Sequence, residues 1–186
     1  MIITISGAEG SGKSTLAKKL EQELEFPRIY VGGIRRKIAA ERGMTLATFN
    51  EWSETNPEGD VEVDQRVVSE VSHMKNAIVE GRVMFHFFPN SIKIFLDVDT
   101  DTAAKRIFGD LKKGNRNEDD NLTSTLAVKN SLLERRKSDK LRYKKYYNLD
   151  VFDHANYDLV IDTTNIPQEA TFEKVISFIT SHNEKQ

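Results

Sequence analysis

Eight residues near the amino end have the types and spacing needed to bind phosphate: Gly7-Ala8-Glu9-Gly10-Ser11-Gly12-Lys13-Ser14. They match G-x-x-x-x-G-K-[ST], the P-loop motif. The glycines allow a tight turn whose backbone N–H groups point inward around an anion. We expect Lys13 to reach the β- and γ-phosphates, and the Ser14 hydroxyl to ligate Mg²⁺. The motif therefore predicts a site for a nucleoside triphosphate, which we take to be ATP, with Mg²⁺. The predicted ATP-binding residues here are Gly7, Gly10, Ser11, Gly12, Lys13, Ser14 and Thr15.

The residues on both sides of the motif are those that a P-loop requires. Residues 1–5 form an apolar run, and Leu16, Leu20 and Leu24 follow the motif at the four-residue spacing of a helix. A helix that begins near Lys13 adds its positive end and its unpaired N–H groups to the anion site. The alternative interpretation is a glycine-rich turn that binds no ligand, but the strand before it and the helix after it favour the phosphate site.

The composition describes a globular protein with an uneven charge. The chain has 186 residues, a hydrophobic fraction of 38%, no cysteine and a formal net charge of −2. Disulfides and thiolate metal sites are therefore excluded. No secretory signal precedes the motif and no apolar run approaches the ~20 residues of a membrane span, so we expect a cytoplasmic protein. Residues 105–145 carry 13 Lys and Arg against 6 Asp and Glu. This basic segment favours a phosphate-rich small ligand over nucleic acid, because it contains no nucleic-acid module.

The pattern along the chain predicts strands that alternate with helices. Expected strands lie at 1–5, 28–31, 77–79, 92–96 and 159–161. Between them we expect helices that include 34–42, a short helix after Thr45, one ending near Lys75, one after Asp99 or Thr100, one over 124–147 and one after Pro167. Residues 109–121 are polar, and we expect them to be mobile. Such alternation predicts an α/β fold with a parallel sheet covered on both faces.

Two charged residues follow the third expected strand. Ligands of open α/β sheets bind at the carboxyl ends of the strands. Glu80 and Arg82 stand at this end, so we expect both to face the cleft beside the P-loop.

Beyond the P-loop, a series of short motifs in fixed order resembles the nucleoside monophosphate kinases, and among them the archaeal-type cytidylate kinases. The motifs are Gly32 to Arg36, Glu41-Arg42-Gly43-Met44, Val79-Glu80-Gly81-Arg82, Lys93 to Asp97, Arg135 to Tyr143, Tyr147 to Asp150 and Tyr157 to Thr163. The resemblance runs nearly end to end. It implies one P-loop kinase domain with three layers, α/β/α, around a five-stranded parallel sheet. The core would comprise 1–32, 76–106 and 141–186, with a monophosphate-binding lobe at 33–75 and a lid at about 107–140.

The same resemblance implies roles for individual residues. Arg36 and Arg82 would hold the monophosphate, and Arg135 and Arg142 would reach the transferred group from the lid side. Guanidinium groups suit these roles because they bind phosphate oxygens bidentately and stay charged. The predicted catalytic residues are Lys13, Arg82, Arg135 and Arg142; the substrate-binding residues are Gly33, Arg36, Asp64, Arg82 and Asp139; the metal-binding residues are Ser14 and Glu80; and Arg106 would stack on adenine.

Each role has a simpler alternative. The helix with Arg135 and Arg142 could be a solvated basic face, and Asp64 could be a surface acid. The neighbours of Gly33 and the residue after Arg82 depart from the family pattern, which leaves the acceptor base open: CMP or dCMP is expected first and UMP next. Two further hypotheses are a P-loop kinase for another small acceptor, and a non-catalytic ATP-binding regulatory or assembly protein. We expect a monomer.

Overall fold

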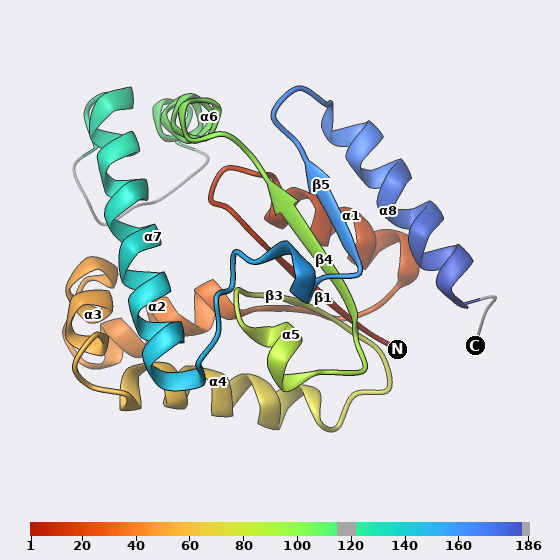
Figure 1. Ribbon diagram of the computed structural model, residues 1–186, viewed down its shortest axis with the longest axis horizontal. Coiled ribbons are helices and arrows are strands. Elements are labelled where there is room, and N and C mark those ends of the chain that lie inside the picture. Colours follow the sequence, from red (N-terminus) through yellow and green to blue (C-terminus); the bar gives the residue numbers. More distant parts are fainter. Residues whose placement is uncertain (115–121, 184–186) are drawn as a thin grey trace.

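The computed structural model describes residues 1–114 and 122–183, which form five parallel strands and the helices around them (Figure 1). The strands are β1 (Ile2–Gly7), β2 (Arg28–Tyr30), β3 (Ala77–Glu80), β4 (Ile92–Asp97) and β5 (Leu159–Asp162). They pair in the order β2-β3-β1-β4-β5, and every pair is parallel. β1 therefore lies at the centre of the sheet, so the P-loop that follows it opens at the middle of the carboxyl edge.

Helices connect the strands. The described helices are α1 (Lys13–Leu24), α2 (Val31–Glu41), α3 (Leu46–Ser53), α4 (Glu58–Val71), α5 (Met84–Phe87), α6 (Thr100–Lys112), α7 (Thr125–Tyr147), a 3₁₀ turn η1 (His154–Asn156) and α8 (Gln168–Asn183). None of them is both long enough and apolar enough to cross a membrane.

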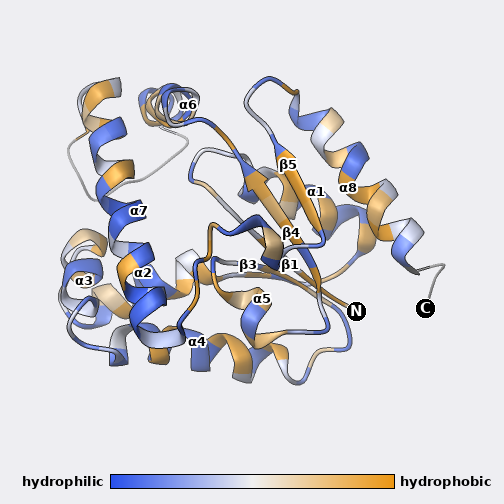
Figure 2. Cartoon of the chain, in the orientation of Figure 1, coloured by the Kyte–Doolittle hydropathy of each residue, from blue (hydrophilic) through white to orange (hydrophobic). Residues whose placement is uncertain are grey.

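The two faces of the sheet belong to two separate apolar clusters. Side chains alternate along a strand, so Ala77 and Val79 of β3 pack in one cluster while Ile78 between them packs in the other. The first cluster includes Ile38 of α2, and the second includes Leu20 of α1. The strands β4 and β5 are accordingly among the most hydrophobic segments in Figure 2. The predicted α/β fold, with helices on both faces of a five-stranded parallel sheet, is confirmed.

Several predicted helix ends are confirmed by their capping bonds. The side chains of Thr45 and Asp99 accept hydrogen bonds from the backbone N–H three residues later, at 3.1 and 2.9 Å. Gly43, with φ of 68°, follows α2, and Asn148, with φ of 55°, follows α7. Both residues adopt the left-handed conformation that commonly ends a helix.

Three parts of the chain differ from the sequence-based expectation. The helix expected over 34–42 begins earlier, at Val31, and includes Gly32 and Gly33, so the strand before it ends at Tyr30. α6 extends to Lys112, into the predicted mobile segment 109–121, because Leu111 continues the apolar face of Ile107 and packs against the cluster shared with α7. Residues 115–121 of that segment lie outside the described residues. The short helix α5 was not expected, since four residues are too few for a periodic pattern.

Candidate active site

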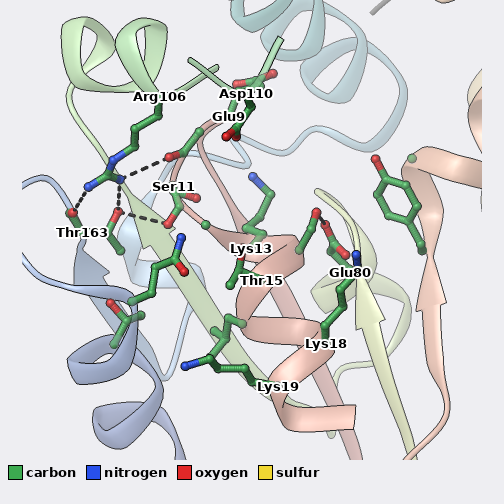
Figure 3. Close-up of a pocket in the computed structure, with 18 of the residues that line it drawn as sticks. Glu9, Ser11, Lys13, Thr15, Lys18, Lys19, Glu80, Arg106, Asp110 and Thr163 are labelled. Atoms are coloured by element: carbon green, nitrogen blue, oxygen red, sulfur yellow. Dashed lines mark hydrogen bonds between the residues drawn. The ribbon is translucent and has the colours of Figure 1, made fainter. Parts of the chain in front are cut away.

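A cleft of about 1050 Å³ runs along the carboxyl edge of the sheet (Figure 3). The P-loop and the start of α1 form its floor, and residues from α2, β3, α6, α7 and α8 form its walls. Of the predicted site residues, the cleft is lined by Gly10, Ser11, Gly12, Lys13, Ser14, Thr15, Arg36, Glu80, Arg82, Arg106 and Arg135. The fold thus brings the P-loop and four of the predicted arginines, from distant parts of the chain, to a single cavity.

The glycines of the P-loop are required by the backbone itself. Gly7 has φ of 135°, and a Cβ there would lie 2.0 Å from the carbonyl oxygen of Leu96. Gly10 has φ of 73° and packs against the backbone of Ala103 in α6. Only glycine combines a positive φ with so close a neighbour, because it has no Cβ. Gly7 lies at the base of the loop, so it shapes the cradle from below without lining the cleft.

Lys13 lies within the loop and contacts its carbonyl groups. Its Nζ donates to the carbonyl oxygen of Gly7 at 2.9 Å and to that of Ala8 at 2.5 Å. Burial, and then the nearby Arg82 guanidinium, lower the pKa of Lys13 from 10.5 to about 7. Incoming phosphates would stabilise the charged form, so Lys13 has a direct electrostatic reason to bind them.

Ser14 and Glu80 form an oxygen pair that suits a magnesium ion. The Ser14 hydroxyl donates to Oε1 of Glu80 at 2.5 Å, and Nε of Arg28 donates to Oε2 at 3.1 Å. Mg²⁺ in phosphate sites is usually held by one or two protein oxygens together with phosphate oxygens and water. The hydroxyl and carboxylate present therefore fit this ion.

Arg106 is fixed at the rim of the P-loop. Its guanidinium donates to the carbonyl oxygens of Gly10 at 3.2 Å and of Thr163 at 2.7 Å, and Thr163 in turn donates to the carbonyl oxygen of Ser11 at 3.1 Å (Figure 3). These bonds join α6 and the segment after β5 to the loop. Arg106 is thus beside the predicted nucleotide, and its stacking on adenine stays a prediction.

Arg36 lies on the opposite wall, in α2. Its Nη1 donates to the Tyr30 hydroxyl at 2.8 Å and to the carbonyl oxygen of Gly32 at 3.3 Å. Tyr30 and Gly32 line the cleft with it. Gly33 is the next residue but is not among the described residues that line the cleft; a Cβ there would lie 3.0 Å from the Tyr30 ring. The predicted role of Gly33 in substrate binding therefore stays a prediction. Its lack of a side chain leaves room for the Tyr30 ring.

Arg82 and Arg135 meet at a carboxylate that the sequence did not single out, Glu9 of the P-loop. Arg82 makes short contacts with both Glu9 and Asp139, and Nε of Arg135 lies 3.2 Å from Oε1 of Glu9. Burial alone would raise the pKa of Glu9, but Arg82 and Arg135 outweigh it and hold that pKa below 4.5. Glu9 is thus a buried anion between two arginines of the cleft. Its only sequence signal is an acid inside a phosphate-binding motif.

Asp139 and Arg142 belong to an ion network beneath the cleft. Arg142 is 1% exposed and contacts both Asp139 and Asp60, and Asp60 also accepts from Nη1 of Arg35 at 2.8 Å. Burial opposes ionisation of Asp139, but Arg82 and Arg142 hold its pKa below 3.8. Neither Asp139 nor Arg142 is among the described residues that line the cleft; the contact between Asp139 and Arg82 links them to it. No motif of the sequence assigns a role to Arg35 or Asp60, so only the fold reveals their part in this network.

Asp64 is buried against a tyrosine rather than facing the cleft. It is 5% exposed, and the Tyr147 hydroxyl donates to its Oδ2 at 2.6 Å. Burial raises the pKa of Asp64 from 3.8 to about 7, despite the opposing hydrogen bond from Tyr147. In this structure Asp64 is part of the packing between α4 and α7, and its predicted contact with the acceptor base stays a prediction.

Comparison with known proteins supports the same interpretation. Residues 2–165 match the cytidylate kinase-like family. The cytidylate kinase of Methanocaldococcus jannaschii is 35% identical over 184 residues, which cover 96% of this chain and 97% of that protein. A protein of Lacinutrix mariniflava, named S-adenosylmethionine-dependent nucleotide dehydratase, is 34% identical over 184 residues, which cover 98% of this chain but 36% of that protein. The chain thus spans about a third of the length of this second relative.

The solved structures that it resembles share the fold. Shikimate kinase from Bacteroides thetaiotaomicron superimposes with a TM-score of 0.60 at 15% identity, over 99% of this chain and 98% of that one. This level of identity shows the architecture alone. The order of the strands, the P-loop at the centre of the sheet and the match over nearly the whole sequence lead to one conclusion. The chain belongs to the cytidylate kinase-like family.

Proposed function

We propose that the protein transfers the γ-phosphoryl group of ATP to a nucleoside monophosphate, with CMP or dCMP as the favoured acceptor. The observation that carries this proposal is the shared cleft: the P-loop cradle and Arg36, Arg82 and Arg135 line one cavity. A cradle for the donor phosphates and guanidiniums for a second phosphate are what such a transfer needs. The acceptor CMP is favoured by the cytidylate kinases among the relatives.

The chemistry would consist mostly of positioning and charge stabilisation. The oxygen of an acceptor phosphate is already anionic, so the transfer needs no general base. The transition state carries negative charge on its equatorial oxygens, and preorganised donors in a water-poor site stabilise that charge. Lys13 would bind the donor phosphates, while Arg36 and Arg82 would hold the acceptor phosphate. Arg135 of α7 lines the same cleft, where it would contact the group as it is transferred to the acceptor phosphate.

Mg²⁺ would be held at Ser14 and Glu80, where it would neutralise charge on the donor phosphates. Because Glu80 is also bonded to Arg28, its carboxylate is already oriented toward Ser14. We further propose that α2, α3 and α4 form the acceptor lobe of residues 33–75, and that residues 107–140 act as a lid. Closure would exclude water and so limit hydrolysis of ATP.

The test is a panel of acceptors. ADP release is measured with ATP, Mg²⁺ and each of CMP, dCMP, UMP, AMP and GMP, beside a reaction without acceptor. We expect CMP or dCMP to give the highest kcat/KM, with UMP next. Release that no nucleotide accelerates would contradict the proposal; stimulation by a non-nucleotide metabolite would instead identify a kinase for another acceptor. Tight ATP binding with no acceptor effect would point to a regulatory protein.

A further inference from the structure

Glu9 occupies an unusual place for a carboxylate. It lies inside the P-loop, its side chain is 8% exposed, and it lines the cleft (Figure 3). A loop that binds phosphate through N–H groups and a lysine gains nothing from a fixed negative charge of its own. The acid therefore has to be explained by what it contacts rather than by the donor nucleotide.

Its contacts are two arginines of the proposed transfer: Arg82, which would hold the acceptor phosphate, and Arg135, which would contact the group as it is transferred to that phosphate. Glu9 Oε1 is bonded to Nη2 of Arg82 and lies 3.2 Å from Nε of Arg135. Arg82 stands two residues after the end of β3 and Arg135 lies in the middle of α7, so one carboxylate oxygen joins the sheet edge to the lid side of the cleft. Asp139 contacts the same guanidinium at its Nε atom.

When an acceptor phosphate enters the cleft, the guanidiniums of Arg82 and Arg135 are already paired with carboxylates. A phosphate and a carboxylate cannot share them without like-charge repulsion in a buried site. The phosphate carries the larger charge and can bind both arginines bidentately, so it can displace the carboxylate. The cost of displacing Glu9 then lowers the apparent affinity for the acceptor, because only the fraction of molecules with released arginines binds it.

We propose that Glu9 competes with the acceptor's phosphate for Arg82 and Arg135, so that it sets acceptor affinity and keeps both arginines from the donor's γ-phosphate until an acceptor arrives. This inference rests on the proposed function. Glu9 is here a positioning residue: it acts through the two arginines. The same pairing explains how a site built to stabilise a transferred phosphoryl group would avoid transferring it to water.

The first test measures phosphate binding without turnover. The P-loop is saturated with ADP and Mg²⁺, and inorganic phosphate is titrated calorimetrically into the wild type and into Glu9→Gln, which keeps the size of the side chain and removes its charge. We expect the Kd for phosphate to fall about tenfold in the variant, as it would if only about a tenth of wild-type molecules have released arginines. An unchanged or higher Kd would overturn the inference.

The matched control is Glu134→Gln, which removes an exposed acid next to Arg135 on α7. We expect its phosphate Kd to stay within about twofold of wild type, since a solvent-exposed charge is largely screened. An equal fall in both variants would show a general charge effect and would also overturn the inference. If Glu9→Gln fails to fold, Glu9→Asp takes its place, because it retracts the charge by one methylene. We expect its phosphate Kd to lie below that of wild type by less than about tenfold.

The second test uses steady-state kinetics with CMP. In Glu9→Gln we expect KM for CMP to fall about tenfold and ATP hydrolysis without acceptor to rise by a similar factor. A merely structural role would lower kcat and raise KM, which would contradict the inference. The two proposals fail separately: if wild type phosphorylates CMP but Glu9→Gln binds phosphate no better, only this inference fails. If no acceptor is phosphorylated, the proposed function fails, and the phosphate titration still measures the competition.

Discussion

Arg82 lies between two carboxylates of the candidate site, Glu9 and Asp139. Burial would disfavour its charged form, but Asp139 and Glu9 outweigh this and raise its pKa above the ordinary value. The guanidinium therefore stays charged in a largely buried position. A fixed, planar cation at the end of β3 is suited to hold a phosphate in one orientation.

We expect Arg82→Ala to lower kcat about 10²–10³-fold, because it removes a charge that stabilises the transition state. Arg82→Lys should recover only part of this loss, since an ammonium cannot bind two oxygens in the fork geometry. The measurement is steady-state ADP release with CMP, and a thermal unfolding curve checks that the variant is folded. Arg66→Ala serves as the control, because Arg66 pairs with Glu62 on the surface, away from the cleft. If Arg82→Ala turned over at the wild-type rate, Arg82 would have no part in the transfer.

Asp64 gives a prediction that depends on pH. Its pKa is about 7 in the folded protein and near 3.8 when exposed. A raised folded pKa means that the neutral form stabilises the fold below about pH 4, and that this contribution is lost as pH rises to 7. Asp64→Asn has no such loss. We therefore expect the free energy of unfolding of Asp64→Asn, relative to wild type, to rise between pH 5 and pH 8 by on the order of 1–3 kcal/mol.

Urea denaturation of both proteins at pH 5, 6 and 8 measures this difference. Other groups titrate in both proteins, so their contributions cancel in the comparison. A difference in stability that stays constant over this range would contradict a raised pKa for Asp64.

The residues that the sequence could identify are those whose local pattern defines their chemistry. Lys13 and Ser14 follow from the P-loop letters, and Glu80 from its place at the end of a strand. Glu9 could not be found this way, because its partners Arg82 and Arg135 are 73 and 126 positions away in the chain. Arg142 shows the opposite case: its residue type suggests phosphate binding, and only the packed structure reveals that it is bonded to Asp60 and Asp139.

At the scale of elements, α4 contacts both α2 and α7, and so links the helices of the predicted acceptor lobe to α7. Asp60 in its first turn contacts Arg35 of α2 and Arg142 of α7, and is 2% exposed. α3 also packs against α7, and the Tyr146 hydroxyl donates to the carbonyl oxygen of Ser53 at 2.7 Å. Figure 1 shows α2, α3 and α4 gathered around the carboxyl half of α7. The ion network therefore holds together segments far apart in the sequence.

We expect Asp60→Ala to lower the free energy of unfolding by about 3 kcal/mol or more, because it leaves two buried guanidiniums without a shared carboxylate. Glu62→Ala on the same helix is the matched control. Glu62 pairs with Arg42 and Arg66 on the surface, where such pairs contribute less than about 1 kcal/mol. Urea denaturation at pH 7 measures both variants. Equal effects of the two substitutions would show that burial does not distinguish these ion pairs.

The elements themselves were predictable to different degrees. Caps at Thr45, Asp99 and Asn148 have strong local signals, and the structure confirms them. α7 would not be recognised as amphipathic, because its buried residues include the charged Asp139 and Arg142 beside apolar ones such as Leu132, and these charges pair only in the fold. The start of α2 was misplaced, since two consecutive glycines usually weaken a helix and here lie in its first turn, beside Tyr30.

At the scale of the whole molecule, the sheet order explains why one cleft can serve two phosphates. β1 is central, so the P-loop opens between the ends of β3, which carries Glu80 and precedes Arg82, and β4, which leads to α6 and Arg106. The alternation of strands and helices was sufficient to predict a parallel sheet. The position of β1 between β3 and β4 rests on non-local pairing that no stretch of sequence encodes by itself, and in the sequence analysis the five-stranded kinase fold came from the resemblance.

The central claim is that the cleft brings two phosphates together for direct transfer. The most direct measurement follows the phosphoryl group itself: ATP labelled in its γ-phosphate is incubated with the protein, CMP and Mg²⁺, and the products are separated. We predict that the label appears in the β-phosphate of CDP, and that Lys13→Ala abolishes its transfer. Label that appears only in inorganic phosphate, at a rate that CMP does not change, would contradict the account.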